Sequence, residues 1–554
     1  MFAVPDWLPL QQLAIVLSVA LAGGVVWALE RPTDSWGASL RRRFVLGVPW
    51  GTLVTIAFVL CVYLFVQGGW DHWYAPVTIP FRAWSYLYPL GILTAPFSHM
   101  GPGHLMGNLI GTVTLAPLVE YAWGHFPRER GSSSFGSWRT NPYVRSLLVF
   151  PAVVVGVGVL TGAFAVGPII GFSGVVFAFA GFALVYYPYR TVLALLAGRV
   201  VRLVYDAFLN PRTVASASPS YGVPWWAQIA IQGHALGFLV GVVVGIWWLH
   251  RRGDEPPTPL RLWTGVLLLG VVQSLWAVYW FRGGQTFVLF RAVGVALVML
   301  LATLVTYAVT ASERPVVDLP DVSADAVRSI PRWRVGAVLL LLGAALISGP
   351  AVPVNLMRAS QEPLPGQTVQ VRGYEVTYAE NVTSGMVAVL DVSAFGETTD
   401  VRTSGVIVRN RRRSLWTTAI SKGRLRFTGT RAVRLGGLGW RDRVVANRTG
   451  WQTVGGPAAY RVRLTHDGET TTVFTSPPAR ADPVVAGRNV SIDPAVDDFV
   501  VVVSTNNTTV ETAPLPGKNE TSSAGGVRFV RDKQSLYAVR GDTRVRVATR
   551  ETYE

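Results

Sequence analysis

The sequence predicts a polytopic α-helical membrane protein that ends in an all-β domain. Half of its 554 residues are hydrophobic, only 15% are charged, and the mean hydropathy is +0.37. Such a composition is too apolar for a soluble chain of this length. Long apolar runs occupy residues 9–350, whereas residues 358–554 contain short alternating stretches rich in Val and Thr. These two sequence patterns predict a helical membrane part and a β-rich part.

Ten apolar runs are long enough to be transmembrane helices, which need about 17 to 25 residues. The run at 190–208 is the weakest because it contains Arg199, Arg202 and Asp206. We keep it as a span, since without it the two chain ends would lie on opposite sides of the membrane. The predicted spans are 9–29, 44–66, 103–122, 145–167, 171–189, 190–208, 225–249, 263–281, 286–311 and 334–350.

The distribution of arginine predicts the orientation of these spans. Turns rich in arginine, such as 41–43 and 250–252, alternate along the chain with turns that carry few charges. The positive-inside rule places the arginine-rich turns in the cytoplasm and therefore the amino terminus outside. No basic segment precedes the first apolar run, so we expect no cleavable signal peptide.

The last 200 residues or so read as a β domain. Stretches such as "QTVQVRGYEVTYA" and "DDFVVVVST" alternate in polarity and are separated by Gly, Asn and Pro, as is typical of a β-sandwich. All N-x-[ST] sequons lie in this region, which suggests a glycosylated exterior domain on a cell-membrane protein. The sequons are at Asn381, Asn447, Asn489, Asn506, Asn507 and Asn519.

Composition also argues against several functions. The net charge of +17 comes from arginines scattered between apolar runs, so we predict no nucleic-acid binding. A single cysteine, Cys61, excludes an intrachain disulfide and a cysteine metal cluster. Nothing in the sequence calls for a metal or a cofactor, and nothing sets the oligomeric state.

Three of the apolar runs carry polar residues near their predicted outer ends. His104 and Asn108 are four residues apart and therefore share one face of a helix. Ser173 begins a second helix, and His234 lies on a third. Polar and ionisable groups at membrane depth are costly and usually functional. Their similar depth therefore predicts a common site.

These residue types suit acyl transfer. Serine becomes a nucleophile when a base takes its proton, and imidazole is suited to that role. We therefore predict Ser173 as nucleophile and His234 as general base, in a Ser–His dyad without an acidic third member. The side chains of His104 and Asn108, with the Ser173 backbone N–H, are predicted to form an oxyanion hole.

Each of these residues also has an ordinary structural explanation. A transmembrane serine commonly bonds the carbonyl one turn back. A histidine such as His234 can be an interhelical hydrogen-bonding group, a metal ligand or a proton relay, and Asn often joins helices. Gly237 and Gly241 have the spacing of a close-packing motif. Only their joint placement favours catalysis.

Three stretches resemble the signatures of rhomboid intramembrane serine proteases, in the family's order. They are "HMGPGHLMGN", "GFSG" and "GHALGFLVG", and the resemblance covers about residues 44–250. It implies a rhomboid-like six-helix core in which Ser173 and His234 are catalytic. Phe177 replaces a family tyrosine one turn after the serine, keeping the ring without the hydroxyl. The resemblance also implies supporting roles for His99, Gly171, Gly174, Phe177, Gly237 and Gly241.

The predicted organisation has four parts. An extra amino-terminal helix with a basic inner loop (1–43) precedes the protease core (44–250), which further transmembrane helices (251–357) and the exterior β domain (358–554) follow. The resemblance implies an endopeptidase that cleaves single-span membrane proteins near the outer leaflet of the lipid bilayer. Two alternatives stay open: a catalytically inactive rhomboid-like protein that binds membrane clients, and a transporter or sensor with His234 and Arg199 as a relay.

Overall fold

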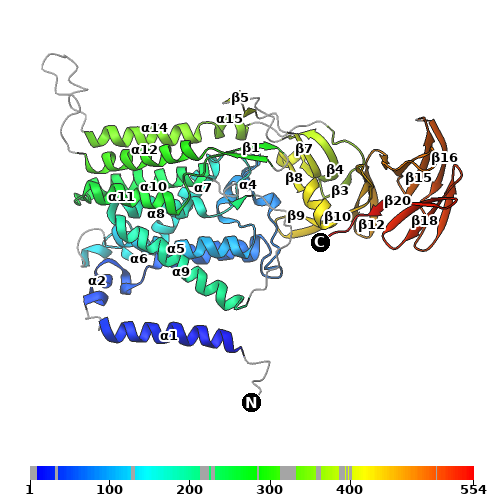
Figure 1. Ribbon diagram of the computed structural model, residues 1–554. Helices are drawn as coiled ribbons and strands as arrows, with labels where there is room; N and C mark the ends of the chain where they lie inside the picture. The colour runs from blue at the N-terminus through cyan, green and yellow to red at the C-terminus, as the bar shows by residue number, and fades with distance from the viewer. Residues whose placement is uncertain are drawn as a thin grey trace, which may run out of the picture. The chain divides into compact units, whose positions relative to one another are not determined.

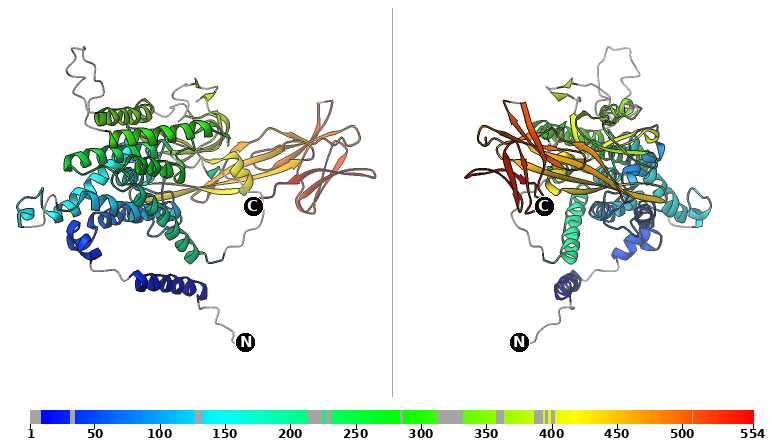
Figure 2. Two further views of the ribbon diagram at one scale, coloured as in Figure 1. Left: turned by 60° about the vertical axis from the view of Figure 1, so that its left-hand side comes forward. Right: turned by 90° about the vertical axis from the view of Figure 1, so that its right-hand side faces the viewer.

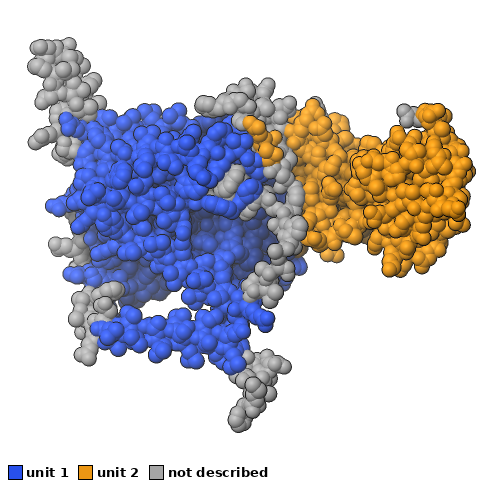
Figure 3. Space-filling view, in the orientation of Figure 1, with its two compact units in different colours: residues 1–219, 224–280, 287–357 blue, residues 220–223, 281–286, 358–554 orange. Residues whose placement is uncertain are grey.

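The chain folds into a helical unit and a β-rich unit, which Figure 3 shows in different colours. The helical unit comprises residues 1–219, 224–280 and 287–357, and the β-rich unit comprises 220–223, 281–286 and 358–554. The structure is a computed structural model, and it describes residues 9–30, 35–126, 132–212, 224–225, 231–283, 286–311, 332–356, 363–385, 393–394, 397–398, 402–506 and 508–554.

The helical unit is built from long helices that lie side by side in Figures 1 and 2. Each of the ten predicted spans contains a helix. The helices are α1 (Leu10–Glu30), α2 (Ser35–Arg43), α3 (Trp50–Cys61, continued by a π-helical turn at Val62–Val66), α4 (Pro89–Thr94), α5 (Pro102–Trp123), α6 (Pro142–Val144, continued by a π-helical turn at Arg145–Val149), α7 (Phe150–Ala163), α8 (Ser173–Tyr186), α9 (Pro188–Leu209), α10 (Ile231–Arg252), α11 (Pro259–Val272), α12 (Arg291–Thr310), α14 (Arg332–Ser348) and α15 (Ala351–Leu356).

Length and hydropathy support membrane insertion for most of these helices. Within the described residues, five helical segments are long and apolar enough to cross a membrane: Leu10–Leu29, Pro142–Ala163, Ile231–Arg252, Arg291–Thr310 and Arg332–Leu356. Three shorter helices, Trp50–Val66, Ser173–Tyr186 and Pro259–Val272, are also apolar. Helices α5 and α9 are not among them and carry polar side chains such as His104 and Arg202.

Helix α8 forms the centre of the helical unit. Every residue from Gly174 to Val185 is buried, and Figure 1 shows α8 between α5 and α10. A helix that is apolar all round has no polar face to turn towards water, so neighbouring helices enclose it. Helix α1 is the opposite case, because none of its apolar window is buried inside the protein.

The structure corrects the predicted ends of two spans. We predicted helices over 263–281 and 286–311, but α11 ends at Val272 and α12 begins at Arg291. Between them lies an antiparallel pair, β1 (Tyr279–Gly283) and β2 (Thr286–Leu289). Two glycines between aromatic and β-branched residues are a hairpin signal that the apolar character of the run concealed.

The β-rich unit confirms the predicted all-β region. It contains an eight-stranded antiparallel sheet in the order β12-β11-β10-β20-β19-β18-β17 with β9 on β10, and the four-stranded sheets β13-β14-β15-β16 and β3-β4-β7-β8. The strands are β3 (Val369–Val371), β4 (Tyr374–Thr383), β5 (Ser393–Ala394), β6 (Glu397–Thr398), β7 (Arg402–Asn410), β8 (Leu415–Ser421), β9 (Thr430–Gly437), β10 (Trp440–Thr453), β11 (Ala458–His466), β12 (Glu469–Thr475), β13 (Ala479–Arg480), β14 (Asn489–Pro494), β15 (Phe499–Thr505), β16 (Thr508–Pro514), β17 (Thr521–Ala524), β18 (Val527–Asp532), β19 (Ser535–Arg540) and β20 (Thr543–Arg550), with one short helix, α16 (Lys422–Thr428).

Alternating side chains give the β-rich unit its core. Along β14, every second residue from Val490 to Pro494 is buried. Ile492 and Val501 from the β13–β16 sheet share one apolar cluster with Phe529 and Leu536 from the eight-stranded sheet. Two sheets that bury their inner faces against each other are the arrangement of a sandwich.

Candidate active site

The turn before α8 is shaped by Gly171. Its φ of +127° is a conformation that side-chain-bearing residues rarely adopt. A Cβ on Gly171 would also lie 2.5 Å from His104 Cε1 and 3.6 Å from Asn108 Nδ2. The missing side chain therefore lets His104 pack directly against the backbone of Gly171, with Asn108 close by, two residues before Ser173.

Helices α8 and α10 approach each other backbone to backbone. A Cβ on Gly237 would overlap the carbonyl oxygen of Gly174, and a Cβ on Gly241 would overlap that of Ala178. Small residues at a four-residue spacing allow such an approach between helices in a membrane. The close packing brings one face of α10, with His234 on it, against the amino-terminal end of α8.

Ser173 and His234 meet at this contact. His234 Nε2 lies 2.8 Å from Ser173 Oγ, and the Phe177 ring stacks on the imidazole with 4.3 Å between ring centroids and 11° between planes. His234 Nδ1 is buried and has no partner among the described residues. If Nε2 is to accept the serine proton, Nδ1 must carry the hydrogen. Packing against Phe177 thus orients the imidazole here, without a carboxylate.

His104 and Asn108 project from the first two turns of α5 towards Gly171. The backbone N–H of Met100 points at His104 Nδ1 over 3.5 Å, which assigns the ring hydrogen to Nε2. A Cβ on Gly171 would lie 2.7 Å from this Nε2. Asn108 is buried, and its Nδ2 has no partner within the part of the chain described. Two N–H donors therefore lie beside the backbone of Gly171, two residues before Ser173.

His99 is buried and packs against His104. The His99 and His104 rings meet edge to face, with 5.1 Å between their centroids. The side chain of Gln67 holds the His99 backbone: its Oε1 accepts from His99 N at 2.7 Å, and its Nε2 donates to His99 O at 2.8 Å. This arrangement fits a supporting role in which His99 packs against the imidazole of His104.

Sequence reasoning missed a buried polar network at the other end of α5. The Glu120 carboxylate accepts from Gly51 N at 2.7 Å and from Thr52 N and Oγ1 at 2.8 and 2.7 Å. His125 Nε2 lies 2.6 Å from the same carboxylate. A carboxylate at the start of α3 is favoured by the helix dipole. The available signal was the acidic residue inside the apolar run 103–122.

Among the described residues, one cluster has the composition of a metal site. The ligand atoms of Asp442, His466 and Asp467 in the β-rich unit lie within 4.8 Å of one another. His466 Nε2 is already paired with Asp442 Oδ2 at 3.1 Å, and Arg443 N donates to the same carboxyl group at 2.7 Å. Hydrogen bonding therefore accounts for this cluster without an ion.

Comparison with protein families gives one result. The family model of the Rhomboid domain matches residues 86–251, a segment that includes Ser173, His234, His104 and Asn108. Comparisons with curated proteins and with solved structures gave no significant match. The matched segment and the apolar helices identify the chain as an integral membrane protein that contains a Rhomboid domain over residues 86–251.

Proposed function

We propose that this protein is an intramembrane serine endopeptidase that cleaves transmembrane segments near their outer ends. The observation that carries this proposal is the 2.8 Å contact between Ser173 Oγ and His234 Nε2 on two helices packed backbone to backbone. The rhomboid family acts on transmembrane substrates within the bilayer, which favours a single-span membrane protein as substrate.

The reaction begins with His234 Nε2 taking the proton of Ser173 Oγ as the oxygen attacks the scissile carbonyl carbon. A C–O bond forms, and the negative charge passes to the carbonyl oxygen. His104 Nε2–H, Asn108 Nδ2–H and the Ser173 backbone N–H are the donors placed to stabilise that oxyanion. The C–N bond then breaks, and His234 donates its proton to the leaving amine.

Hydrolysis of the acyl-enzyme repeats these steps with water as the nucleophile. His234 takes a proton from the water, the hydroxide attacks the acyl carbon, and the Ser173 oxygen leaves and recovers the proton. A substrate carbonyl is reachable only where the segment has left its helical conformation. We therefore expect substrates with Gly, Pro or small residues near the outer end of the span.

Arginines at the far end of α5 support the orientation with the site near the outer leaflet. Arg145 donates to the carbonyls of His125 and Gly124 at 2.9 and 3.1 Å, and Arg252 donates to that of Trp123 at 3.0 Å. They cap the carboxyl-terminal end of the helix whose first turn contains His104. The positive-inside rule assigns this basic end to the cytoplasm.

The sequons are a weaker support for an exterior β-rich unit. Asn381, Asn506 and Asn519 are exposed and able to accept a glycan. All three also have positive φ, between 49° and 63°, and asparagine is favoured there in any case. Asn447 is less accessible, since its Nδ2 donates to Thr430 Oγ1 at 2.8 Å. If the unit is glycosylated, we expect glycans at the three exposed positions and not at Asn447, which peptide mass spectrometry would show.

Labelling with a serine-directed fluorophosphonate probe tests the proposed function. We expect the purified wild-type protein to be labelled at Ser173 and the Ser173→Ala variant to remain unlabelled. An inactive client-binding relative would bind membrane proteins without reacting with the probe. A folded wild-type protein that does not react would therefore favour that alternative.

A further inference from the structure

The loop from Phe164 to Phe172 connects α7 to the serine and is held by side chains from two other helices. We propose that Asn355 of α15, together with Gln232 of α10, positions this loop, and through it Gly171 and Ser173, for catalysis. This inference rests on the function proposed above. Asn355 lies more than 100 residues beyond the end of the matched rhomboid domain at residue 251.

The first contact satisfies the carboxyl-terminal end of α7. A helix leaves its last carbonyl groups without partners inside the helix. Asn355 Nδ2 donates to Ala163 O at 3.2 Å and to Ala165 O at 3.0 Å, and the hydroxyl of Tyr86 donates to Ala163 O at 2.6 Å. Asn355 and Ala165 are both completely buried. Without the amide of Asn355, the carbonyl of Ala165 would lose this donor in a buried position.

The second contact links the loop to the helix that carries His234. Gln232 Nε2 donates to Phe164 O at 2.8 Å and to Ile347 O at 3.1 Å, while its Oε1 accepts from Val166 N at 3.1 Å. Gln232 precedes His234 by two residues on α10. One amide therefore connects three elements: the helix of the proposed base, the loop before the nucleophile, and the end of α14.

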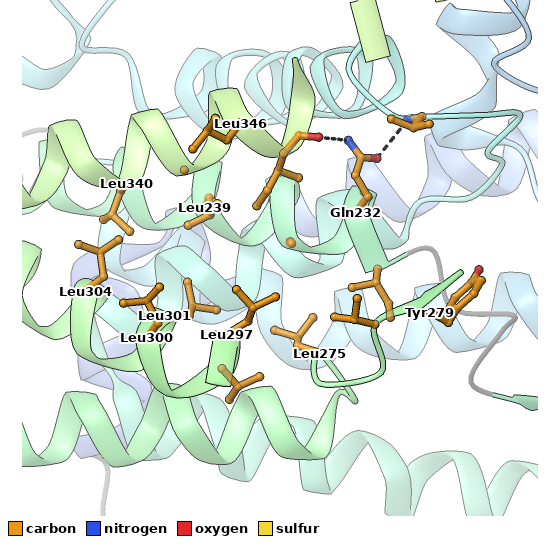
Figure 4. A pocket seen from close by; sticks show the side chains of 18 of the residues that line it. Gln232, Leu239, Leu275, Tyr279, Leu297, Leu300, Leu301, Leu304, Leu340 and Leu346 are labelled. Atoms are coloured by element: carbon orange, nitrogen blue, oxygen red, sulfur yellow. Dashed lines mark hydrogen bonds between the residues drawn. The ribbon is translucent and has the colours of Figure 1, made fainter. Parts of the chain in front are cut away.

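The surroundings make these hydrogen bonds hard to replace. Gln232 is one of the residues that line a groove of about 780 Å³, and Figure 4 shows its side chain with those of other lining residues. Aliphatic side chains, such as those of Leu239, Leu340 and Leu346, line most of this groove. Backbone groups released by loss of the Gln232 amide would face aliphatic side chains, where an unsatisfied polar group is costly.

The other side of the loop is fixed by the rhomboid domain itself and the residues just before it. Ala83 N donates to Ile169 O at 3.1 Å, and Gly171 N donates to Ala95 O at 2.9 Å. The backbone carbonyl of Asn355 joins this side as well, because it accepts from Ser85 Oγ and Tyr86 N at 2.9 and 2.8 Å. The loop is thus clamped on both sides, and Asn355 contacts both the loop and the segment that holds it.

Small displacements of this loop have large consequences for the proposed chemistry. Gly171 packs against His104 and lies near Asn108, the two side chains proposed to bind the oxyanion, and Ser173 follows two residues later. A shift of about 1 Å in a reacting group can cost on the order of 100-fold in rate. Asn355 and Gln232 do not touch the substrate in this account, so their role is positioning.

The test uses three variants of the full-length protein. Asn355→Asp keeps the shape of the side chain but, when ionised, replaces the N–H donors by acceptors. Gln232→Met keeps a side chain of similar length and removes the amide, and it serves if Asn355→Asp does not fold. Leu356→Ala is the matched control, because Leu356 is the exposed neighbour of Asn355 on α15.

Two readouts are measured on each purified variant. Hydrogen exchange of peptides covering residues 163–172 reports the order of the loop whether or not the protein is a protease. The rate constant of fluorophosphonate labelling, normalised to the fraction of molecules labelled at saturation, reports the reactivity of each correctly folded site. Normalisation separates positioning from a loss of folded protein.

We expect faster exchange of the 163–172 peptides in Asn355→Asp and Gln232→Met, and a labelling rate constant per site lowered on the order of 10- to 100-fold. Leu356→Ala should match the wild type in both. Unchanged exchange in the loop, or a reduced labelled fraction with an unchanged rate constant per site, would overturn the inference. If the wild type itself is not labelled, the proposed function fails, and the exchange data still decide whether Asn355 orders the loop.

Discussion

Two histidines of the helical unit, the buried His125 and the half-buried His234, differ in how fully their rings are hydrogen bonded. His125 Nδ1 accepts from Val45 N at 3.0 Å, and its Nε2 donates to the carboxylate of Glu120 at 2.6 Å. His234 has Ser173 as partner for Nε2, whereas no described residue bonds Nδ1. Buried polar groups in folded proteins are normally paired. Because both ring nitrogens of His125 are hydrogen bonded, this residue fits a structural role. His234, for which the described residues provide a hydrogen bond at Nε2 only, fits a chemical role.

The same contrast extends to the neighbours of each histidine. Around Glu120, donors from Gly51, Thr52 and His125 all reach the carboxylate. Near His234, buried nitrogens of Asn108 and His99 have no partner in the described residues. Sites of chemistry commonly break local rules that the rest of the fold observes. Close packing of α8 on α10 keeps Ser173 and His234 in position although some nitrogens around them lack hydrogen-bond partners in the described part of the chain.

The largest expected effect is that of His234→Ala. Cleavage of a single-span substrate should fall below detection, because the base and the nucleophile act as a unit. The thermal unfolding temperature should hardly change, since His234 contributes one side-chain hydrogen bond to the fold. Combining it with Ser173→Ala should cause no further loss. Full cleavage by purified His234→Ala protein would show that His234 is not the general base, and the contrast with His125 would then fail.

Asn108→Ala should have the next largest effect on rate. Removing one oxyanion donor typically costs about 100- to 1000-fold in kcat, with little change in ground-state binding. Steady-state kinetics on a reconstituted substrate will separate the two parameters. A raised KM with an unchanged kcat would instead make Asn108 a substrate contact.

Glu120→Ala should have the opposite effects to His234→Ala: it should lower stability and leave the reactivity of Ser173 unchanged. It leaves the N–H groups of Gly51 and Thr52 and the ring of His125 buried without their acceptor, at a cost of about 3–5 kcal/mol in stability. The unfolding temperature and the fraction of labelled molecules should fall. The labelling rate constant of the molecules that remain folded should stay at the wild-type value, and a specific loss of that rate constant would contradict a purely structural role.

The smallest effect is expected from deletion of residues 358–554. This truncation keeps Asn355 and every proposed catalytic group, so the rate of Ser173 labelling in membranes should be unchanged, while the choice of substrates is free to change. Normal insertion combined with loss of labelling would assign part of the active site to the β-rich unit.

The sequence predicted the helical membrane fold, the β region and the residues proposed for catalysis because their signals are local. Ser173 follows Gly171 in a recognisable turn, and His234 precedes Gly237 on a close-packing face. The hairpin at 279–289 was missed because an apolar run fits a strand as well as a helix. Asn355 bonds a carbonyl 192 residues away, and its own surroundings in the sequence contain no sign of that contact. The contacts of such a residue can be recognised only from the tertiary structure.

Cleavage of a single-span protein by purified enzyme in lipid vesicles tests the central claim most directly. The wild-type protein should cut the substrate once, near the outer end of its span, and Ser173→Ala should leave it intact while keeping the same unfolding temperature. Mass spectrometry of the products locates the bond. Cleavage at the same bond by Ser173→Ala, with contaminating proteases excluded, would contradict the account because it would remove Ser173 as the nucleophile.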